Sequence, residues 1–220
     1  MTDILTNIAN IHSDMAAHSA QDATILAVTK YADMDQTETI VKSPYIKACG
    51  ENKVQNGHIK TAAFPDMRWE FIGHLQSNKI RKAIASFDRI QSVDSLKCAH
   101  KIAKIGQEIH PVDILIQING GEEPNKFGFF WDEIEAVQSE LFALKGLRIS
   151  GIMVVAPFTN DLIKLGKIYK KSYQVFEKWQ QHSTLVQTLS MGMSHDYKIA
   201  LDHGATMVRI GRLILTGGLP

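Results

Sequence analysis

The feature that most constrains this chain of 220 residues is an alternation of short β-forming runs and helical segments, repeated about eight times. Parallel strands joined by helical crossovers produce such an alternation. Eight units favour a single closed (β/α)8 TIM barrel over an open, doubly wound sheet. The expected strands are 24–30, 45–50, 68–73, 89–93, 113–119, 147–155, 186–190 and 206–210.

No change in composition marks a domain boundary, so residues 1–220 are expected to form one domain. Apolar residues at Ile4, Ile8, Ile11 and Met15 follow helical spacing. They predict an amphipathic N-terminal helix within residues 1–20 that covers one end of the barrel.

Composition excludes several classes of protein. The net charge is only +1 and no basic block occurs, which argues against binding to nucleic acid. The N-terminus is too polar for a signal peptide or a membrane span. Cys49 and Cys98 lack the spacing of a metal or redox motif. We therefore expect a cytoplasmic protein with reduced thiols and no membrane contact.

Active sites of such barrels lie at the carboxyl ends of the strands. This rule selects candidates by position: Lys30, Asn52, Gly73–His74, Asn119, Met153, Ser190–Gly192 and Arg209–Arg212. Lys30 ends a buried strand, where partial desolvation would favour the uncharged amine that forms a Schiff base. The alternative is that Lys30 ends the strand and points into solvent, as most lysines do.

The last two expected strand ends are rich in glycine. Gly192 and Gly211 would let the backbone approach an anion closely, with Ser190 and Ser194 as hydroxyl donors. Barrels commonly bind phosphate after these strands. The alternative is that the glycines only permit tight turns.

Lys30 and this phosphate site together suggest a phosphorylated aldehyde as ligand. If the ligand also contained a pyridine ring, Arg209 would keep the ring nitrogen unprotonated, because a nearby cation opposes a second positive charge. A structural ion pair is the other reading of Arg209. His195 and His203 lie on one expected helix without further ligands, so no metal site is expected.

The chain resembles the pyridoxal 5′-phosphate homeostasis (YggS/PROSC) family along nearly its whole length. The matching segments are Ala27-Val-Thr-Lys30, Gly50-Glu-Asn52 with Val54-Gln55, Phe71-Ile-Gly-His-Leu-Gln-Ser-Asn-Lys79, Ile116-Gln-Ile-Asn119, Gly151-Ile-Met153 with Ala156-Pro157, Leu189–Ser194 and Val208-Arg-Ile-Gly211.

The resemblance implies a barrel like the N-terminal domain of alanine racemase, with pyridoxal 5′-phosphate (PLP) held covalently on Lys30 as a Schiff base. Ser190, Gly211 and the backbone at Arg212 would hold the phosphate. Arg209 would face the pyridine nitrogen, and Asn52 would lie near the ring hydroxyl. The family is regarded as PLP carriers or regulators of vitamin B6 balance without established catalysis, and we expect a monomer that can supply PLP-dependent apo-enzymes.

Three positions depart from the family pattern. Arg212 stands where a small hydroxyl residue is common, and its own charge can replace that phosphate contact. Leu215-Thr216-Gly217 replaces a usual Phe-Gly, which affects packing near the C-terminus. Asn125-Lys-Phe-Gly128 replaces a pattern that begins with serine, so no role of that serine carries over.

Three functions compete. The leading hypothesis is a PLP-binding protein without efficient turnover, because a racemase needs a second acid/base that a further domain supplies in alanine racemase. The second is a PLP-dependent amino-acid racemase or lyase of low activity, with His74 or Tyr31 as the base. The third is a Schiff-base aldolase of phosphosugars without a cofactor.

Overall fold

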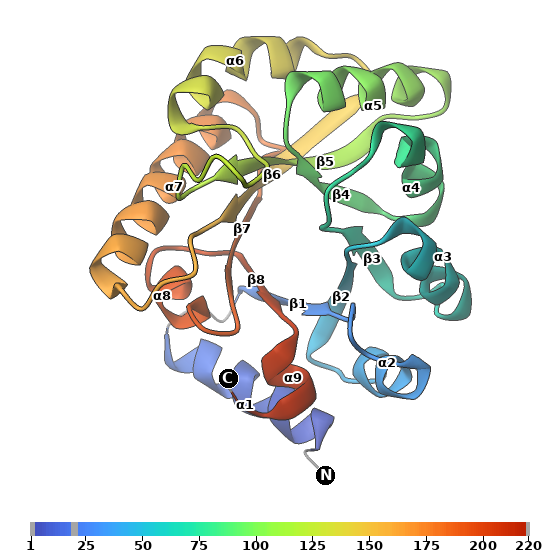
Figure 1. The fold of residues 1–220 in the computed structure, drawn as a ribbon, viewed down its shortest axis with the longest axis vertical. Coiled ribbons are helices and arrows are strands. Elements are labelled where there is room, and N and C mark those ends of the chain that lie inside the picture. Colours follow the sequence, from blue (N-terminus) through green and yellow to red (C-terminus); the bar gives the residue numbers. More distant parts are fainter. Residues whose placement is uncertain (1–2, 19–21, 219–220) are drawn as a thin grey trace.

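The computed structural model describes residues 3–18 and 22–218, and its centre is a closed barrel of parallel strands (Figure 1). Each strand pairs with the next one in the chain, and β8 pairs with β1 to close the sheet. The predicted (β/α)8 barrel is therefore confirmed. The strands are β1 (Thr24–Val28), β2 (Ile46–Glu51), β3 (Arg68–Phe71), β4 (Arg89–Val93), β5 (Val112–Asn119), β6 (Leu147–Val155), β7 (Thr188–Met193) and β8 (Met207–Ile210).

Helices surround the barrel as an outer ring (Figure 1). They are α1 (Ile4–Ala17), α2 (Met34–Val41), α3 (Val54–Ala63), the short 3-10 turn η1 (Ser77–Lys79), α4 (Ile80–Ser86), α5 (Leu96–Glu108), α6 (Trp131–Ala143), α7 (Leu162–His182), α8 (Tyr197–Asp202) and α9 (Arg212–Thr216). Helix α1 packs beside α9, α2 and α8 and buries Ile8, Ile11 and Met15. Residues 1, 2, 19 and 20 of the predicted N-terminal segment lie outside the described residues.

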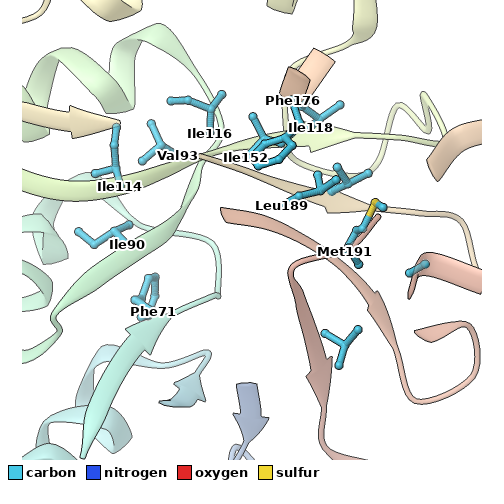
Figure 2. Packing of buried hydrophobic residues seen from close by; sticks show 14 of the residues in the cluster. Phe71, Ile90, Val93, Ile114, Ile116, Ile118, Ile152, Phe176, Leu189 and Met191 are labelled. Atoms are coloured by element: carbon cyan, nitrogen blue, oxygen red, sulfur yellow. The ribbon is translucent and has the colours of Figure 1, made fainter. Parts of the chain in front are cut away.

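The main hydrophobic core lies between the strands and the helices. Ile114, Ile116 and Ile118 alternate along β5 and join a cluster that includes Phe176 of α7 (Figure 2). Side chains of a strand point alternately to its two faces, so the residues between them face the barrel interior. Burial of each such aliphatic side chain stabilises the folded state by roughly 1.5–3 kcal/mol relative to leaving it exposed to water. This layer fixes the strands, and with them the side chains that point inward.

The carboxyl ends of β1, β2, β3 and β7 differ from the prediction by one to three residues, and the differences in β1 and β7 bear on the site. Strand β7 continues to Met193, so Ser190 lies within the strand rather than at its end. Strand β1 ends at Val28, so Lys30 belongs to the loop that follows. Parallel hydrogen bonding to neighbouring strands, which residue type alone does not specify, decides where each strand stops.

The barrel interior contains a chain of buried polar side chains. Glu70 of β3 accepts two hydrogen bonds from Arg89, at 2.7 and 2.9 Å. Gln91 donates to Glu70 at 2.5 Å and accepts a hydrogen bond of 2.8 Å from the Ser190 hydroxyl. The same hydroxyl accepts from Arg209 Nη1 at 3.0 Å. The chain therefore connects β3 and β4 with β7 and β8 across the interior.

The carboxyl group of Glu70 is held in its ionised form. Burial alone would raise the pKa of Glu70, but the charge and hydrogen bonds of Arg89, with further hydrogen bonds from Arg68 and Gln91, outweigh burial. The pKa of Glu70 therefore lies below its ordinary value. At neutral pH the barrel interior thus contains a fully ionised, hydrogen-bonded pair.

Candidate ligand-binding cavity

A cavity of about 500 Å³ opens at the carboxyl ends of the strands. It is lined by Val28, Lys30, Tyr31, Asn52, Ile72, Gly73, His74, Gln117, Phe127, Met153, Val155, Phe158, Asn160, Met193, Ser194, His195, Arg209, Gly211 and Arg212. This volume is in the range of small-molecule sites. Five of the six residues predicted to hold the cofactor lie together here, namely Lys30, Asn52, Arg209, Gly211 and Arg212.

Lys30 lies in a tight turn directly after β1. The turn spans residues 29–32 and is closed by a hydrogen bond of 2.9 Å from the Ala32 amide to the Thr29 carbonyl. The side chain is exposed, with Nζ 4.7 Å from the ring centre of Tyr31. The partly desolvated position expected from the sequence is therefore not observed. Lys30 is the only lysine among the described residues that line the cavity.

Asn52 follows β2 and brings an unused acceptor to the cavity. Its Oδ1 atom is buried and has no hydrogen-bond partner in the described part of the chain. Gly73, after β3, packs against the main chain of Asn52: a Cβ atom there would lie 2.1 Å from the Asn52 carbonyl oxygen. A buried polar atom without a partner costs about 1–3 kcal/mol, so a ligand group that donates a hydrogen bond here would recover that cost.

Arg209 of β8 is a buried cation that faces the cavity. Its guanidinium donates to Ser190 O at 2.8 Å, Ser190 Oγ at 3.0 Å and Val154 O at 2.9 Å, all of them uncharged. Burial lowers the pKa of Arg209, while the negative charge of Asp196 acts in the opposite direction. An arginine has five N–H donors, so these contacts leave donors free for a ligand.

Of the six residues predicted to hold the cofactor, Ser190 is the one that does not line the cavity, and the positional candidates Asn119, Met191 and Gly192 do not line it either. Ser190 is fully buried, and its hydroxyl is engaged by Gln91 and Arg209. Ser194, after β7, lines the cavity instead. Its Oγ lies 3.4 Å from the amide nitrogen of Leu213, which places the segment after β7 beside the start of α9. Ser190 thus supports Arg209, and Ser194 supplies the accessible hydroxyl.

Gly211 and Arg212 complete this side of the cavity. Gly211 packs against β1: a Cβ atom there would lie 3.0 Å from the Val28 carbonyl oxygen. Arg212 begins α9, and its side chain is exposed. The segment after β8 therefore brings the closely packed backbone of Gly211 and the charged side chain of Arg212 to the same wall of the cavity.

Aromatic residues form another part of the wall. His74 stacks on Phe127 with ring centres 3.6 Å apart, and its Nδ1 lies 2.9 Å from an oxygen of Asp94. Sequence reasoning had His74 as a candidate but missed Phe127, which lies in the loop after β5. Asn119 fixes that loop by donating from Nδ2 to the carbonyls of Glu123 and Lys126.

The charge of the cavity selects for anions. Lys30, Arg209 and Arg212 line it, whereas none of its described lining residues is Asp or Glu. No cluster of metal-binding side chains occurs in residues 3–18 and 22–218. His195 lines the cavity, whereas His203 bonds to the carbonyl of Ile199 on its own helix. The arrangement suits a small, anionic, partly aromatic ligand with a group that reacts with an amine.

Comparisons with known proteins point to one family. Residues 4–220 match the family profile described as alanine racemase, N-terminal domain. The pyridoxal phosphate homeostasis protein of Escherichia coli (strain K12) is 30% identical, over 97% of this chain and 96% of that protein. The Synechocystis protein of the same name is 32% identical, over 93% of this chain and 96% of that protein.

A solved relative carries a ligand. PipY of Synechococcus elongatus, in a structure with PLP bound, is 29% identical and superposes with a TM-score of 0.80, covering 93% of this chain and 99% of that chain.

None of the helices in the described residues combines the length and the apolar composition that a membrane span requires.

Proposed function

The chain belongs to the alanine racemase N-terminal domain family and, within it, to the pyridoxal phosphate homeostasis proteins, and we propose that it binds PLP in the cavity and serves PLP homeostasis in the cytoplasm. The observation that carries this proposal is a cavity with three cations, no carboxylate and a single lysine among its described lining residues. That combination fits a phosphate ester that also bears an aldehyde.

The residues of the cavity fit this cofactor. The unused Asn52 Oδ1 can accept a hydrogen bond from the ring hydroxyl. Arg209 would hold a positive charge close to the pyridine nitrogen and so disfavour protonation of that nitrogen. We assign the phosphate to Ser194, Gly211 and the backbone and side chain of Arg212, with Ser190 holding Arg209 in place.

Lys30 provides the covalent attachment in this proposal. Lys30 would contribute its uncharged amine to the aldehyde that PLP supplies when bound, and the aldehyde oxygen would leave as water with the two amine hydrogens. The exposed position of Lys30 leaves the bond open to exchange with another amine. We infer a monomeric carrier that can pass PLP to apo-enzymes, rather than an efficient catalyst.

One experiment tests the proposal directly. On addition of PLP, the purified protein should gain a visible absorption band, and borohydride should remove the band and leave a stable label. A peptide map should place that label on Lys30. A protein that shows no such band after addition of PLP would contradict PLP binding on a lysine and would point towards the sugar aldolase, which has no visible chromophore.

A second function, a weak amino-acid racemase or lyase, has one observation in its favour. Asp94 contacts Nδ1 of His74 and orients the imidazole at the cavity wall, as a general base requires. Turnover of L-amino acids faster than free PLP, lost in His74→Ala, would establish this enzyme. A rate equal to that of free PLP supports the carrier.

Arg212 makes a separable contribution to affinity. If its side chain contacts the phosphate, Arg212→Ala should weaken PLP retention by about three- to tenfold, the range expected for an exposed charge-assisted contact. Inorganic phosphate should compete with PLP in the unchanged protein, and less so in the variant. Arg81→Ala, which removes an exposed arginine paired with Glu108, is the control. Equal PLP affinity in both variants would remove the Arg212 side chain from the phosphate site.

A further inference from the structure

A buried lysine holds the turn that carries Lys30. Lys60 lies on the inner face of α3 and is only 7% exposed. Its Nζ donates to the Thr29 carbonyl at 2.6 Å, to the Ala32 carbonyl at 3.0 Å and to Glu51 Oε1 at 2.8 Å. These contacts use all three N–H donors of the ammonium group. Two of them end on the first and last residues of the four-residue turn that contains Lys30.

Glu51 completes the arrangement from the neighbouring strand. It ends β2 and is almost fully buried. The same oxygen that accepts from Lys60 also accepts from the Thr29 hydroxyl at 2.7 Å. The Thr29 amide donates to the Gly50 carbonyl at 3.1 Å, which extends the pairing of β1 and β2 by one residue. Thr29 is therefore held through both its backbone and its side chain.

A buried ion pair is a poor means of gaining stability. Removing two charges from water costs several kcal/mol per ion, and apolar replacements are often neutral or stabilising. The pair can instead fix the positions of the groups it binds, because an ammonium group with three hydrogen bonds holds each of its three acceptors in place. Here two of those acceptors flank the proposed nucleophile, and the third precedes Asn52, which lines the cavity.

We propose that Lys60 and Glu51 are positioning residues that hold the Lys30 turn so that Nζ of Lys30 reaches the cavity. This inference rests on the proposed function, in which Lys30 attaches PLP. Lys60 acts through the turn and lies outside the cavity wall. Attack on a bound carbonyl depends on placement, and a displacement of about 1 Å can cost on the order of a hundredfold in rate.

The test uses a double variant, Lys60→Met with Glu51→Gln, which leaves no buried charge unpaired. The rate at which borohydride-trapped PLP accumulates on Lys30 should fall by roughly tenfold to a hundredfold. Affinity for pyridoxine 5′-phosphate, which has no aldehyde, should stay within about twofold, because the proposed phosphate contacts lie in the segments that follow β7 and β8. Lys53→Met is the matched control, since Lys53 is exposed at the start of the same helix and makes no capping bond.

A second measurement needs no cofactor. Hydrogen exchange of the Ala32 amide, which bonds to Thr29, should quicken by about tenfold in the double variant and stay unchanged in Lys53→Met. An unchanged exchange rate, or an unchanged rate of Lys30 labelling in the folded double variant, would overturn the positioning role. Equal losses in trapping and in pyridoxine 5′-phosphate affinity would also overturn it, since they indicate general damage.

Two further outcomes separate this inference from the proposed function. If the unchanged protein forms no adduct, the proposed function fails, and the exchange of Ala32 still decides whether Lys60 holds the turn. If the double variant does not fold, Thr29→Val removes the hydroxyl contacts with Glu51 and the Gly50 carbonyl and conserves side-chain shape. That variant should label Lys30 severalfold more slowly, and an unchanged rate would overturn the inference.

Discussion

Replacing Lys30 with alanine is expected to abolish the borohydride-stable label and the visible band completely. Lys30 is the single lysine among the described residues that line the cavity, so no other amine is placed to attack the bound aldehyde. PLP affinity should fall by roughly tenfold or more with the loss of the covalent bond. Stability should change by less than about 0.5 kcal/mol, because the side chain is exposed. Absorption spectra and peptide maps check the first result, and thermal unfolding checks the last.

Binding of PLP and of pyridoxine 5′-phosphate to Lys30→Ala should be compared, because only PLP has the aldehyde that reacts with the lysine. Lys30→Ala should bind pyridoxine 5′-phosphate nearly as well as the unchanged protein, since Arg209, Ser194, Gly211 and Arg212 remain. Lys53→Ala removes an exposed lysine next to Asn52 and should retain the label on Lys30. A label that survives Lys30→Ala on another lysine would refute the assignment of the attachment point.

The barrel could be predicted because alternation is a local property of the sequence. Each apolar run and each amphipathic helix is recognised from its own residues, and eight repeats leave few ways to bury both faces of the sheet. Position then placed Lys30, Asn52, Arg209 and Gly211 near one another without any motif. The structure brings them to one cavity because all follow or end strands at the same side of the barrel.

Other features of the site depend on long-range contacts that residue type does not reveal. Ser190 was expected at a strand end, but pairing with β8 extends β7 to Met193 and leaves Ser190 inside the barrel. Phe127 lies in a loop with no regular pattern. Its place at the cavity wall follows from the contacts that fix that loop, including a hydrogen bond of 2.7 Å that its carbonyl accepts from Gln117.

Lys60 did carry a signal that sequence reasoning missed. It shares the buried face of α3 with Val54 and Gly57, at spacings of three residues. A charged residue on the apolar face of a helix needs a partner, so it marks a buried polar contact even before its acceptors are known. The sequence offers no means to tell that those acceptors are the two ends of the Lys30 turn.

Glu70 connects the stability of the barrel to its binding site. It neutralises Arg89, and through Gln91 and Ser190 it belongs to the same hydrogen-bonded chain as Arg209. Without Glu70, the Arg89 charge stays buried, and the hydroxyls of Ser150 and Thr188 are its remaining hydrogen-bond partners among the described residues. Loss of Glu70 would also free Gln91, which binds the Ser190 hydroxyl, and Ser190 in turn holds Arg209 towards the cavity.

We therefore expect Glu70→Ala to lower the free energy of unfolding at pH 7 by about 3–5 kcal/mol, the usual cost of leaving one member of a buried ion pair alone. Urea unfolding measures this loss. The double variant Glu70→Leu with Arg89→Met should recover most of it, because the buried Arg89 charge is then removed as well. Arg68, which also loses Glu70, is partly exposed and keeps its contact with Asp113. Glu108→Gln makes a similar change at an exposed carboxylate paired with Arg81 and should have little effect. A small loss in Glu70→Ala would contradict the view that this pair holds the barrel interior.

The pH dependence of stability tests the same pair independently. The pKa of Glu70 in the folded protein lies below its ordinary value of 4.5, so the stability it contributes is fully present above about pH 4.5. That contribution is lost as the pH falls through the folded pKa, because protonation leaves Arg89 unpaired. Glu70→Gln has no such proton to gain, so its stability should fall less steeply than that of the unchanged protein below pH 4.5. Parallel acid profiles for the two proteins would show that Glu70 does not titrate with unfolding, and the acid sensitivity would then belong to other carboxylates.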